Sequence, residues 1–435
     1  MGQPALYQAI GRFALIGLVL NAVIGSSVFG LPSVIGARLG PASPWAWLLA
    51  AAGMMLVVAC FAEVASRFGQ AGGPYLYARV AFGQVAGIEM AWLTYLVRLT
   101  AAATNANLFV IYLAEFWPAA TGSIASPVVL AVVLVPLAVA NYRGVGLGLS
   151  VSNGFTIAKL VPLGIFVIAG SALLFSSDVT TPLRPPIAPD LGVWLEVILL
   201  LVFAYGGFEA ALVPLAEAKN PRHDAPVALF TMLGICALLY TLVQAVVVAA
   251  LSDPGASSRP LAAAARVFLG PAGATLMAVG ALVSMYGYLA GAMLNVPRLT
   301  YAMAEQGDLP ARFGAVHRRF RTPHVSVMLF AVLVWALAAA GSFLQNLTLS
   351  AVSRLFTYGA VCVALVVLRR RERRDSPDLN RAWFRIPAGT LVALLGLAFS
   401  AALALRMAER EVVVLGVTLV LGLLHWGWLR RRSRV

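Results

Sequence analysis

Charged residues are scarce in this sequence. They make up 11% of the 435 residues, whereas an ordinary soluble domain carries about a quarter. Hydrophobic residues make up 61% of the chain, and apolar runs of about twenty residues recur from one end to the other. Each run is long enough to cross a hydrocarbon core of about 30 Å. The alternating pattern of a transmembrane barrel is absent. We therefore expect an all-α integral membrane protein.

Residues that hold metals or perform nucleophilic chemistry are also few. Cys60, Cys236 and Cys362 fall in separate apolar runs without paired spacing, so we expect buried free thiols and no metal site. The four histidines have no metal-ligand spacing, no nucleophile has a nearby base, and there is no nucleotide-binding loop. The sequence therefore predicts a protein that is not an enzyme and needs no cofactor.

The apolar runs predict twelve spans, which cover 13–37, 44–66, 84–117, 126–141, 152–176, 191–216, 226–251, 272–302, 324–344, 348–368, 387–406 and 412–429. If the N-terminus is cytoplasmic, 22 of the 31 Lys and Arg residues fall in cytoplasmic segments and six in outer segments, and the rest lie inside spans. Basic residues favour the cytoplasmic side of a membrane. We therefore expect a multi-pass protein of the cytoplasmic (inner) membrane with both termini in the cytoplasm.

The formal net charge of +14 by itself would also fit a protein that binds nucleic acid. Its densest part is the run "RRRERR" at 369–374. This run lies between spans ten and eleven, on the side that the other basic residues assign to the cytoplasm. A basic run at this place needs no binding partner, because its positive charge keeps the loop on the cytoplasmic side. We therefore expect the lipid bilayer, and no nucleic acid, among the partners.

The stretch "NAVIGSSVFGLP" at 21–32 interrupts the first span. Gly25 and Gly30 disfavour a helix, and the proline that ends the stretch cannot donate a backbone hydrogen bond. Between the glycines, Ser26 and Ser27 can bond to nearby backbone instead. Lipid-facing backbone does not tolerate such a break, so the segment should face protein or a water-filled cavity. Small residues also suit a packing face between helices, so this stretch alone leaves both interpretations open.

The sixth span is interrupted in the same way. It contains Gly206 and Gly207 at its centre, followed at once by Glu209, an ionisable residue inside a span. Paired interruptions in two halves of a chain indicate an inverted-repeat transporter with its site near the middle of the membrane. We expect one transmembrane domain, with a first repeat at 1–176, a second at 191–368, and two further spans at 387–429.

The two interruptions have complementary chemistry. An unwound segment exposes N–H groups at the start of the next half-helix and C=O groups at the end of the previous one. The half-helix that begins near Ser26–Phe29 presents donors and a positive dipole end, which suit a carboxylate. Carbonyl groups that can accept from an ammonium are those of Val23, Ile24, Phe203 and Gly206. A carboxylate at one break and an ammonium at the other describe an α-amino acid.

Four motifs in this order are similar to those of the amino acid–polyamine–organocation (APC) permease family. They are "IGSSVFGLP" in span one, "CFAEVASRFGQAGGPYLYARVAFG" at 60–83, "FAYGGFEAALVPLAEAKNPRHDAPVAL" at 203–229, and "NVPRLTYAMAEQGDLP" with "TPHVSV" at and after the end of span eight. The resemblance implies the LeuT-type fold, with a five-plus-five inverted repeat, and alternating access.

The resemblance also implies roles for particular residues. It places the substrate carboxylate on the backbone of Gly25, Ser26, Ser27 and Val28. It places the substrate amine on the carbonyl groups of Val23, Phe203 and Gly206, with the ring of Phe203 as a gate toward the outside. Ser27 departs from the family pattern, because it stands where the motif usually has its second glycine.

Lys159 lies about two turns into span five. It is either a lysine that extends to the inner membrane surface or a buried amine that loads and unloads a proton. Some members of the family that the chain resembles have a lysine here in place of a sodium ion, which favours proton coupling. Glu209 is the other candidate proton carrier, or else the structural partner of a polar neighbour. A permanently charged Lys159 would instead suit an exchanger.

The pocket for the substrate side chain is expected on span three. The resemblance places Thr94 and Tyr95 there, and Arg98 lies one turn further on. Arg98 can receive an acidic side chain or pair with a carboxylate such as Glu209. In either case it disfavours cationic substrates, since like charges repel strongly at low dielectric. Further pocket candidates are Tyr205, Ser284 and Tyr288.

Two groups of charges are expected at the inner ends of the spans. Glu63 and Arg67 are four residues apart on one helix and should pair. Glu217, Lys219 and Arg298 should form an inner gate whose ion pairs break when the site opens inward.

We therefore expect a secondary transporter that takes up neutral amino acids with protons and works as a monomer or homodimer. An exchanger, or a transporter of acidic amino acids or polyamines, is the alternative.

Overall fold

The computed structural model describes residues 11–69, 72–144, 149–175, 189–212, 215, 218–305, 309–374 and 381–432. Within these ranges the chain forms α-helices, joined in places by short 3-10 turns, and no β-strand. The predicted all-α class is therefore confirmed. Glu217 lies outside the described residues, so the structure gives no account of that part of the expected inner gate.

The helices follow the predicted spans closely. Their bounds are α1 Arg12–Val23, α2 Ser27–Leu39, α3 Ser43–Ala65, α4 Gly73–Phe82, α5 Gln84–Leu113, α6 Ala125–Tyr142, α7 Leu149–Phe175, α8 Leu191–Tyr205, α9 Phe208–Ala211, α10 Pro221–Ala250, α11 Pro260–Glu305, α12 His324–Ala340, α13 Phe343–Arg374, α14 Gly389–Ala404 and α15 Glu409–Arg432. In the described chain, nine stretches are long and apolar enough to cross a membrane, and α1, α12 and α14 are shorter apolar helices. The described helices are therefore those of a multi-pass membrane protein.

Two helices differ from the sequence prediction. The helix α4 was not predicted, because its ten residues include Arg79 and are too few to span a bilayer. The helix α11 begins at Pro260, twelve residues before the predicted span at 272–302. Gly270 interrupts it with a φ of 65°, and the predicted span is the part that follows this kink.

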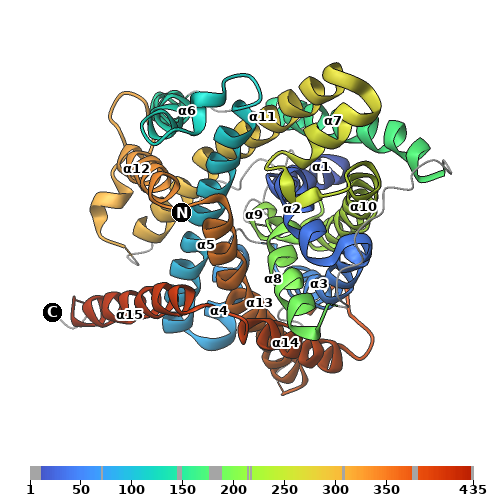
Figure 1. Cartoon of the computed structure of the whole chain (residues 1–435). Coiled ribbons are helices and arrows are strands. Elements are labelled where there is room, and N and C mark those ends of the chain that lie inside the picture. The colour runs from blue at the N-terminus through green and yellow to red at the C-terminus, as the bar shows by residue number, and fades with distance from the viewer. Residues whose placement is uncertain are drawn as a thin grey trace.

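The helices pack around two large buried apolar clusters and a small third one between α4, α5 and α11. The larger one is centred on α1, α2, α3, α8, α10 and α13, and the smaller one joins α5, α6, α11 and α12. Figure 1 shows α6 and α12 together on one side of the bundle, α1, α3, α8 and α10 on the other, and α5 and α13 between them. Outward-facing side chains are themselves apolar on α6, α7 and α15, as expected for helices in contact with lipid.

Ion pairs join helix ends that the sequence assigns to the same side of the membrane. At the expected inner side, Glu63 is fully buried and pairs with both Arg67 and Arg369. At the expected outer side, Glu196 pairs with Arg38 and Arg406. The predicted pair of Glu63 and Arg67 is thus confirmed, with a distance of 3.3 Å between Oε1 and Nη2.

The inner network extends beyond that pair. Glu63 also accepts a hydrogen bond of 2.7 Å from Nε of Arg369 and one of 2.9 Å from the backbone N–H of Ile386. These bonds join α3 to the end of α13 and to the segment before α14. Lys219 and Arg298, the described members of the expected inner gate, are exposed and form no ion pair among the described residues. The ion pairs that the structure describes at the inner end are those around Glu63 and between Arg12 and Asp224.

Glu63→Gln is expected to lower the stability of the purified protein by about 3 kcal/mol or more, because it leaves two arginines without their buried carboxylate. The matched control is Glu196→Gln, whose carboxylate also pairs with two arginines but has a side chain that is 44% exposed. An exposed pair contributes about 1 kcal/mol or less. The measurement is the apparent melting temperature of each variant in detergent, and equal shifts in the two variants would contradict this account.

Candidate substrate site

The two predicted breaks are present, and they lie against each other. The helix α1 ends at Val23 and α2 begins at Ser27, while α8 ends at Tyr205 and α9 begins at Phe208. Figure 1 shows α1, α2 and α9 next to one another. Gly207 has a φ of 115°, and a Cβ atom there would collide with the carbonyl oxygen of Ala22. Only glycine therefore fits where the two breaks meet.

Gly207→Ala is accordingly expected to reduce transport about tenfold or more, because the strained φ alone costs on the order of 1–3 kcal/mol. The control is Gly234→Ala in α10, where no heavy atom lies within 4 Å of an added Cβ. The initial rate of substrate uptake into proteoliposomes, normalised to the amount of folded protein, measures the effect. Normal uptake by Gly207→Ala would show that the contact between the breaks is dispensable.

The start of α2 presents backbone donors at the first break. The first hydrogen bonds of this helix run from the N–H groups of Phe29 and Gly30 to the carbonyl of Ser26. The N–H groups of Ser27 and Val28 precede these bonds, so they are among the unsatisfied donors of a helix start. The N–H of Ser26 donates to Oδ1 of Asn105 in α5, at 3.0 Å.

The end of α1 is capped by the side chain of Lys159 from α7. Its Nζ atom donates to the carbonyl oxygens of Ile24, at 2.7 Å, and Asn21, at 3.2 Å. Lys159 is fully buried, so its side chain does not extend to the membrane surface. None of the described carboxylates lies within ion-pair distance of it. A cation at the C-terminal end of a helix is stabilised by the helix dipole and the free carbonyls.

Glu209 lies directly after the second break, between two arginines. Its Oε1 atom is 3.3 Å from Nε of Arg354 and 3.7 Å from Nη2 of Arg98. Its Oε2 atom accepts from the N–H of Gly207, at 2.9 Å, and from the hydroxyl of Tyr358, at 3.4 Å. The expectation that Arg98 pairs with a carboxylate such as Glu209 is confirmed.

Arg354 of α13 is the site residue that the sequence analysis missed. Its Nη1 atom donates to the carbonyl of Phe203, at 2.9 Å, and its guanidinium carbon lies 5.1 Å from the centre of the Phe203 ring. A Cβ atom on Gly206 would lie 2.7 Å from that carbon. The signal was present in the sequence, because an arginine inside an apolar run marks a functional position.

Several of the predicted pocket residues surround the first break. On α11, Tyr288 comes within 3.5 Å of the position of a Cβ atom on Gly25, and Ser284 lies one turn before it. The hydroxyl groups of Ser26, Thr94 and Ser284 are buried without a hydrogen-bond partner. Buried polar groups are rarely left unpaired, so each of these hydroxyls is available to bond to a further polar group.

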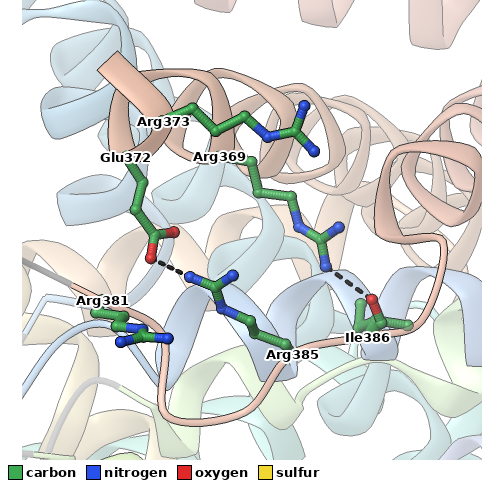
Figure 2. A pocket seen from close by; sticks show the side chains of 6 residues that line it. All are labelled: Arg369, Glu372, Arg373, Arg381, Arg385 and Ile386. Atoms are coloured by element: carbon green, nitrogen blue, oxygen red, sulfur yellow. Dashed lines mark hydrogen bonds and ion pairs between the residues drawn. The ribbon is translucent and has the colours of Figure 1, made fainter. Parts of the chain in front are cut away.

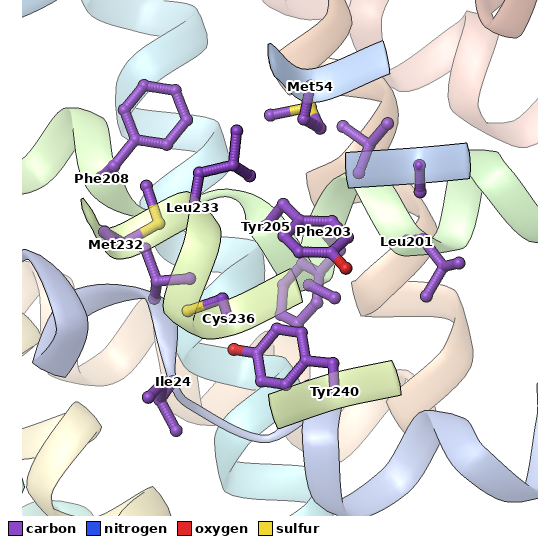
Figure 3. Close-up of a cluster of buried hydrophobic side chains, with 14 of the residues drawn as sticks. Ile24, Met54, Leu201, Phe203, Tyr205, Phe208, Met232, Leu233, Cys236 and Tyr240 are labelled. Atoms are coloured by element: carbon purple, nitrogen blue, oxygen red, sulfur yellow. The ribbon is translucent and has the colours of Figure 1, made fainter. Parts of the chain in front are cut away.

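Two predicted pocket residues have other neighbours. The ring of Tyr95 packs against Phe330 of α12, within the smaller apolar cluster. The hydroxyl of Tyr205 donates to the carbonyl of Trp47, at 2.9 Å, and its ring packs against Tyr240. Figure 3 shows Tyr205 and Tyr240 within the larger apolar cluster. The side chain of Tyr205 is therefore already engaged in the core.

The three cysteines are buried and free, as predicted. In the part of the chain that the structure describes, no group of three or more His, Cys, Asp and Glu residues is placed to hold a metal ion. The polar groups of the site are backbone N–H and C=O groups, hydroxyls and three buried cations with one carboxylate. Such a set can bind and orient a polar molecule within the membrane.

The protein is helical and multi-pass, and its two broken helices abut beside a buried polar site. This is the architecture of a membrane carrier. The model of the amino acid permease family matches residues 10–417, and the chain belongs to this family. It is therefore a multi-pass membrane transporter and not an enzyme.

Three relatives from Bacillus subtilis are similar over nearly their whole lengths. The methylthioribose transporter is 28% identical over 410 residues, which cover 90% of this chain and 86% of the relative. The branched-chain amino acid permease BcaP is 24% identical and covers 100% of this chain and 96% of its own. The serine/threonine exchanger SteT is 26% identical, with 98% of each chain covered.

Proposed function

We propose that this protein carries neutral α-amino acids into the cell by alternating access and that protons drive the uptake. The observation that carries the proposal is the pair of abutting breaks, which offers helix-start donors and helix-end acceptors to one small molecule. Two of the three relatives above are named for transport of neutral amino acids. The distribution of basic residues supports a position in the cytoplasmic membrane with both termini inside.

The proposed carboxylate site is the start of α2. The free N–H groups of Ser27 and Val28, with the positive end of the helix dipole, suit a carboxylate. A side chain at Gly25 would be crowded, because a Cβ atom there would lie 3.2 Å from Oδ1 of Asn105. The hydroxyl of Ser26 has no partner of its own and is available as a further donor. Asn105 holds the backbone of Ser26 in position.

The proposed amine site is made of carbonyl oxygens from both breaks. Those of Val23 and Gly206 are the first candidates. The carbonyl of Ile24 accepts one hydrogen bond, from Lys159. A carbonyl oxygen has two lone pairs, so it can still accept a second bond from an ammonium. The carbonyl of Phe203 already accepts two bonds, from the N–H of Gly206 and from Arg354, so it is the least available of the four.

The charges of the site favour a neutral substrate side chain. Arg98 and Arg354 lie near the breaks, and their repulsion disfavours cationic side chains and polyamines. The one carboxylate of this cluster, Glu209, already pairs with both arginines. Because Glu209 offsets the charge of Arg98, it also reduces the attraction of that arginine for an acidic side chain.

Lys159 is the proposed proton carrier. Its amine is fully buried and rests on the carbonyl groups at the end of α1. Loss of the proton from Nζ would weaken these hydrogen bonds and release the carbonyl of Ile24. Protonation of Lys159 would in this way be coupled to the structure of the broken helix. Glu209 is less suited to this role, because its two arginines stabilise the charged carboxylate.

Exchange without protons is the second candidate function. The same two carbonyl groups suit a permanently charged Lys159 that only completes the end of α1. The named activity of one relative, SteT, is exchange of serine and threonine.

The proposal is tested by competition for uptake of labelled alanine into proteoliposomes that contain the purified protein. Unlabelled competitors would be a neutral, an acidic and a cationic amino acid, a polyamine, and methylthioribose. Inhibition by neutral amino acids, together with no inhibition by their N-acetyl or amide derivatives, would support both halves of the proposed site. No uptake of labelled alanine, together with uptake of labelled methylthioribose, would contradict an amino-acid substrate.

A further inference from the structure

A pocket rich in arginine lies outside the transport site, between the end of α13 and the segment that leads to α14. It has a volume of about 470 Å³, and the residues that line it are Arg369, Glu372, Arg373, Arg381, Arg385 and Ile386. Figure 2 shows these side chains gathered from the last turns of α13 and from the chain opposite. The "RRRERR" run therefore forms part of a concave surface rather than only a charged loop.

Two of the four arginines in the pocket are neutralised by the protein itself. Arg369 pairs with Glu63 and donates to the carbonyl of Ile386, at 2.8 Å. Arg385 pairs with Glu372, whose other carboxylate oxygen accepts from Arg67 at 3.0 Å. Both of the described carboxylates near the pocket are thus fully engaged.

The other two arginines, Arg373 and Arg381, are exposed and have no carboxylate partner among the described residues. In the part of the pocket that the structure describes, these two guanidinium groups therefore have no carboxylate to balance their charge. Guanidinium groups bind phosphate through paired hydrogen bonds, so the pocket suits a phosphate group.

The surroundings of the pocket indicate where such a phosphate would come from. Along the segment before α14, Arg381, Trp383 and Arg385 are exposed while Ala382 is buried between them. Trp383 is 56% exposed. An exposed tryptophan between two arginines is typical of the boundary between the bilayer and water. The distribution of basic residues assigns this boundary to the cytoplasmic side, where anionic lipids attract basic clusters.

We propose that this pocket binds the phosphate of an anionic lipid headgroup at the cytoplasmic face of the membrane. Arg381 contacts the phosphate, Arg373 at the opposite side of the pocket adds positive charge, and Trp383 lies at the level of the headgroups. A free phosphate ion has the same chemistry, but it would gain nothing from Trp383. The bound lipid would hold the end of α13 against the segment before α14.

The test is native mass spectrometry of the delipidated full-length protein, titrated with phosphatidylglycerol or with phosphatidylcholine. The unaltered protein should retain phosphatidylglycerol at lower lipid concentration than phosphatidylcholine. The double variant Arg373→Gln, Arg381→Gln should need about 30-fold more phosphatidylglycerol for the same bound fraction. Arg373→Lys, Arg381→Lys should lose less, because it keeps the charge but not the paired hydrogen bonds.

The control variant is Arg312→Gln, Arg318→Gln, which removes the same charge from two exposed arginines of the loop between α11 and α12. It should bind phosphatidylglycerol as the unaltered protein does. Equal loss in the control and the pocket variant would overturn the proposal, since it would show a general effect of charge. An unchanged affinity in the pocket variant would overturn it as well.

A separate titration with inorganic phosphate distinguishes the two sources of the phosphate group. If phosphate at millimolar concentration displaces phosphatidylglycerol and raises the melting temperature as much as the lipid does, the site belongs to a soluble phosphate and the lipid proposal is wrong. If phosphate has neither effect, the lipid assignment stands.

Discussion

Lys159→Ala is expected to abolish proton-driven accumulation of the amino acid while exchange of internal for external amino acid continues. The alanine leaves the carbonyl of Ile24 in place but removes the only titratable group that contacts it in the described structure. The measurement combines a pH-sensitive dye trapped inside proteoliposomes with uptake of labelled alanine. The amino acid should no longer carry protons inward in the variant.

Lys219→Ala is the matched control, because Lys219 is exposed and is the only other lysine of the sequence. It should keep both proton movement and accumulation. Accumulation at the normal level by Lys159→Ala would show that Lys159 is not the proton carrier. Loss of exchange together with accumulation, in a variant that still folds, would make Lys159 a structural cation of the end of α1.

Arg354→Gln is expected to abolish transport altogether. Arg354 is only 2% exposed and contacts the carbonyl of Phe203, the backbone at Gly206 and the carboxylate of Glu209. Removing one partner of a buried ion pair costs about 3–5 kcal/mol. The variant should therefore lose both uptake and exchange, and its melting temperature in detergent should fall.

The comparison for this prediction is Arg98→Gln, which leaves the closer pair of Glu209 and Arg354 intact. The distance from Glu209 to Arg98 is 3.7 Å, against 3.3 Å to Arg354, and Arg354 also donates to the carbonyl of Phe203. We expect partial uptake of neutral amino acids by Arg98→Gln. Equal loss in the two variants would show that both arginines are needed to hold the second break.

The sequence was sufficient to predict the breaks, because glycine, serine and proline within an apolar run leave few other structures possible. It also placed Glu209 inside a span, but it left open whether Lys159 extends to the membrane surface, and the structure shows that Lys159 is buried. That the two breaks would lie against each other, at Gly207 and Ala22, followed only from the predicted inverted repeat and not from any local pattern. The repeat itself, with its two halves, stays a prediction.

Contacts between distant residues were beyond the sequence. Nothing in the local pattern shows that Arg354 reaches the carbonyl of Phe203, because 151 residues separate them. The same holds for Asn105 and the N–H of Ser26, and for Tyr205, whose hydroxyl bonds to the core rather than to the site. Spacing on one helix gives the face of a residue but not the element that packs against it.

The most direct test of the central claim is uptake of labelled alanine by proteoliposomes, with and without an inward proton gradient. If protons drive uptake, the gradient will cause accumulation above the external concentration, and uptake without it will stop at equilibrium. No response to the gradient, with uptake only when amino acid is loaded inside beforehand, would contradict proton coupling and identify the protein as an exchanger.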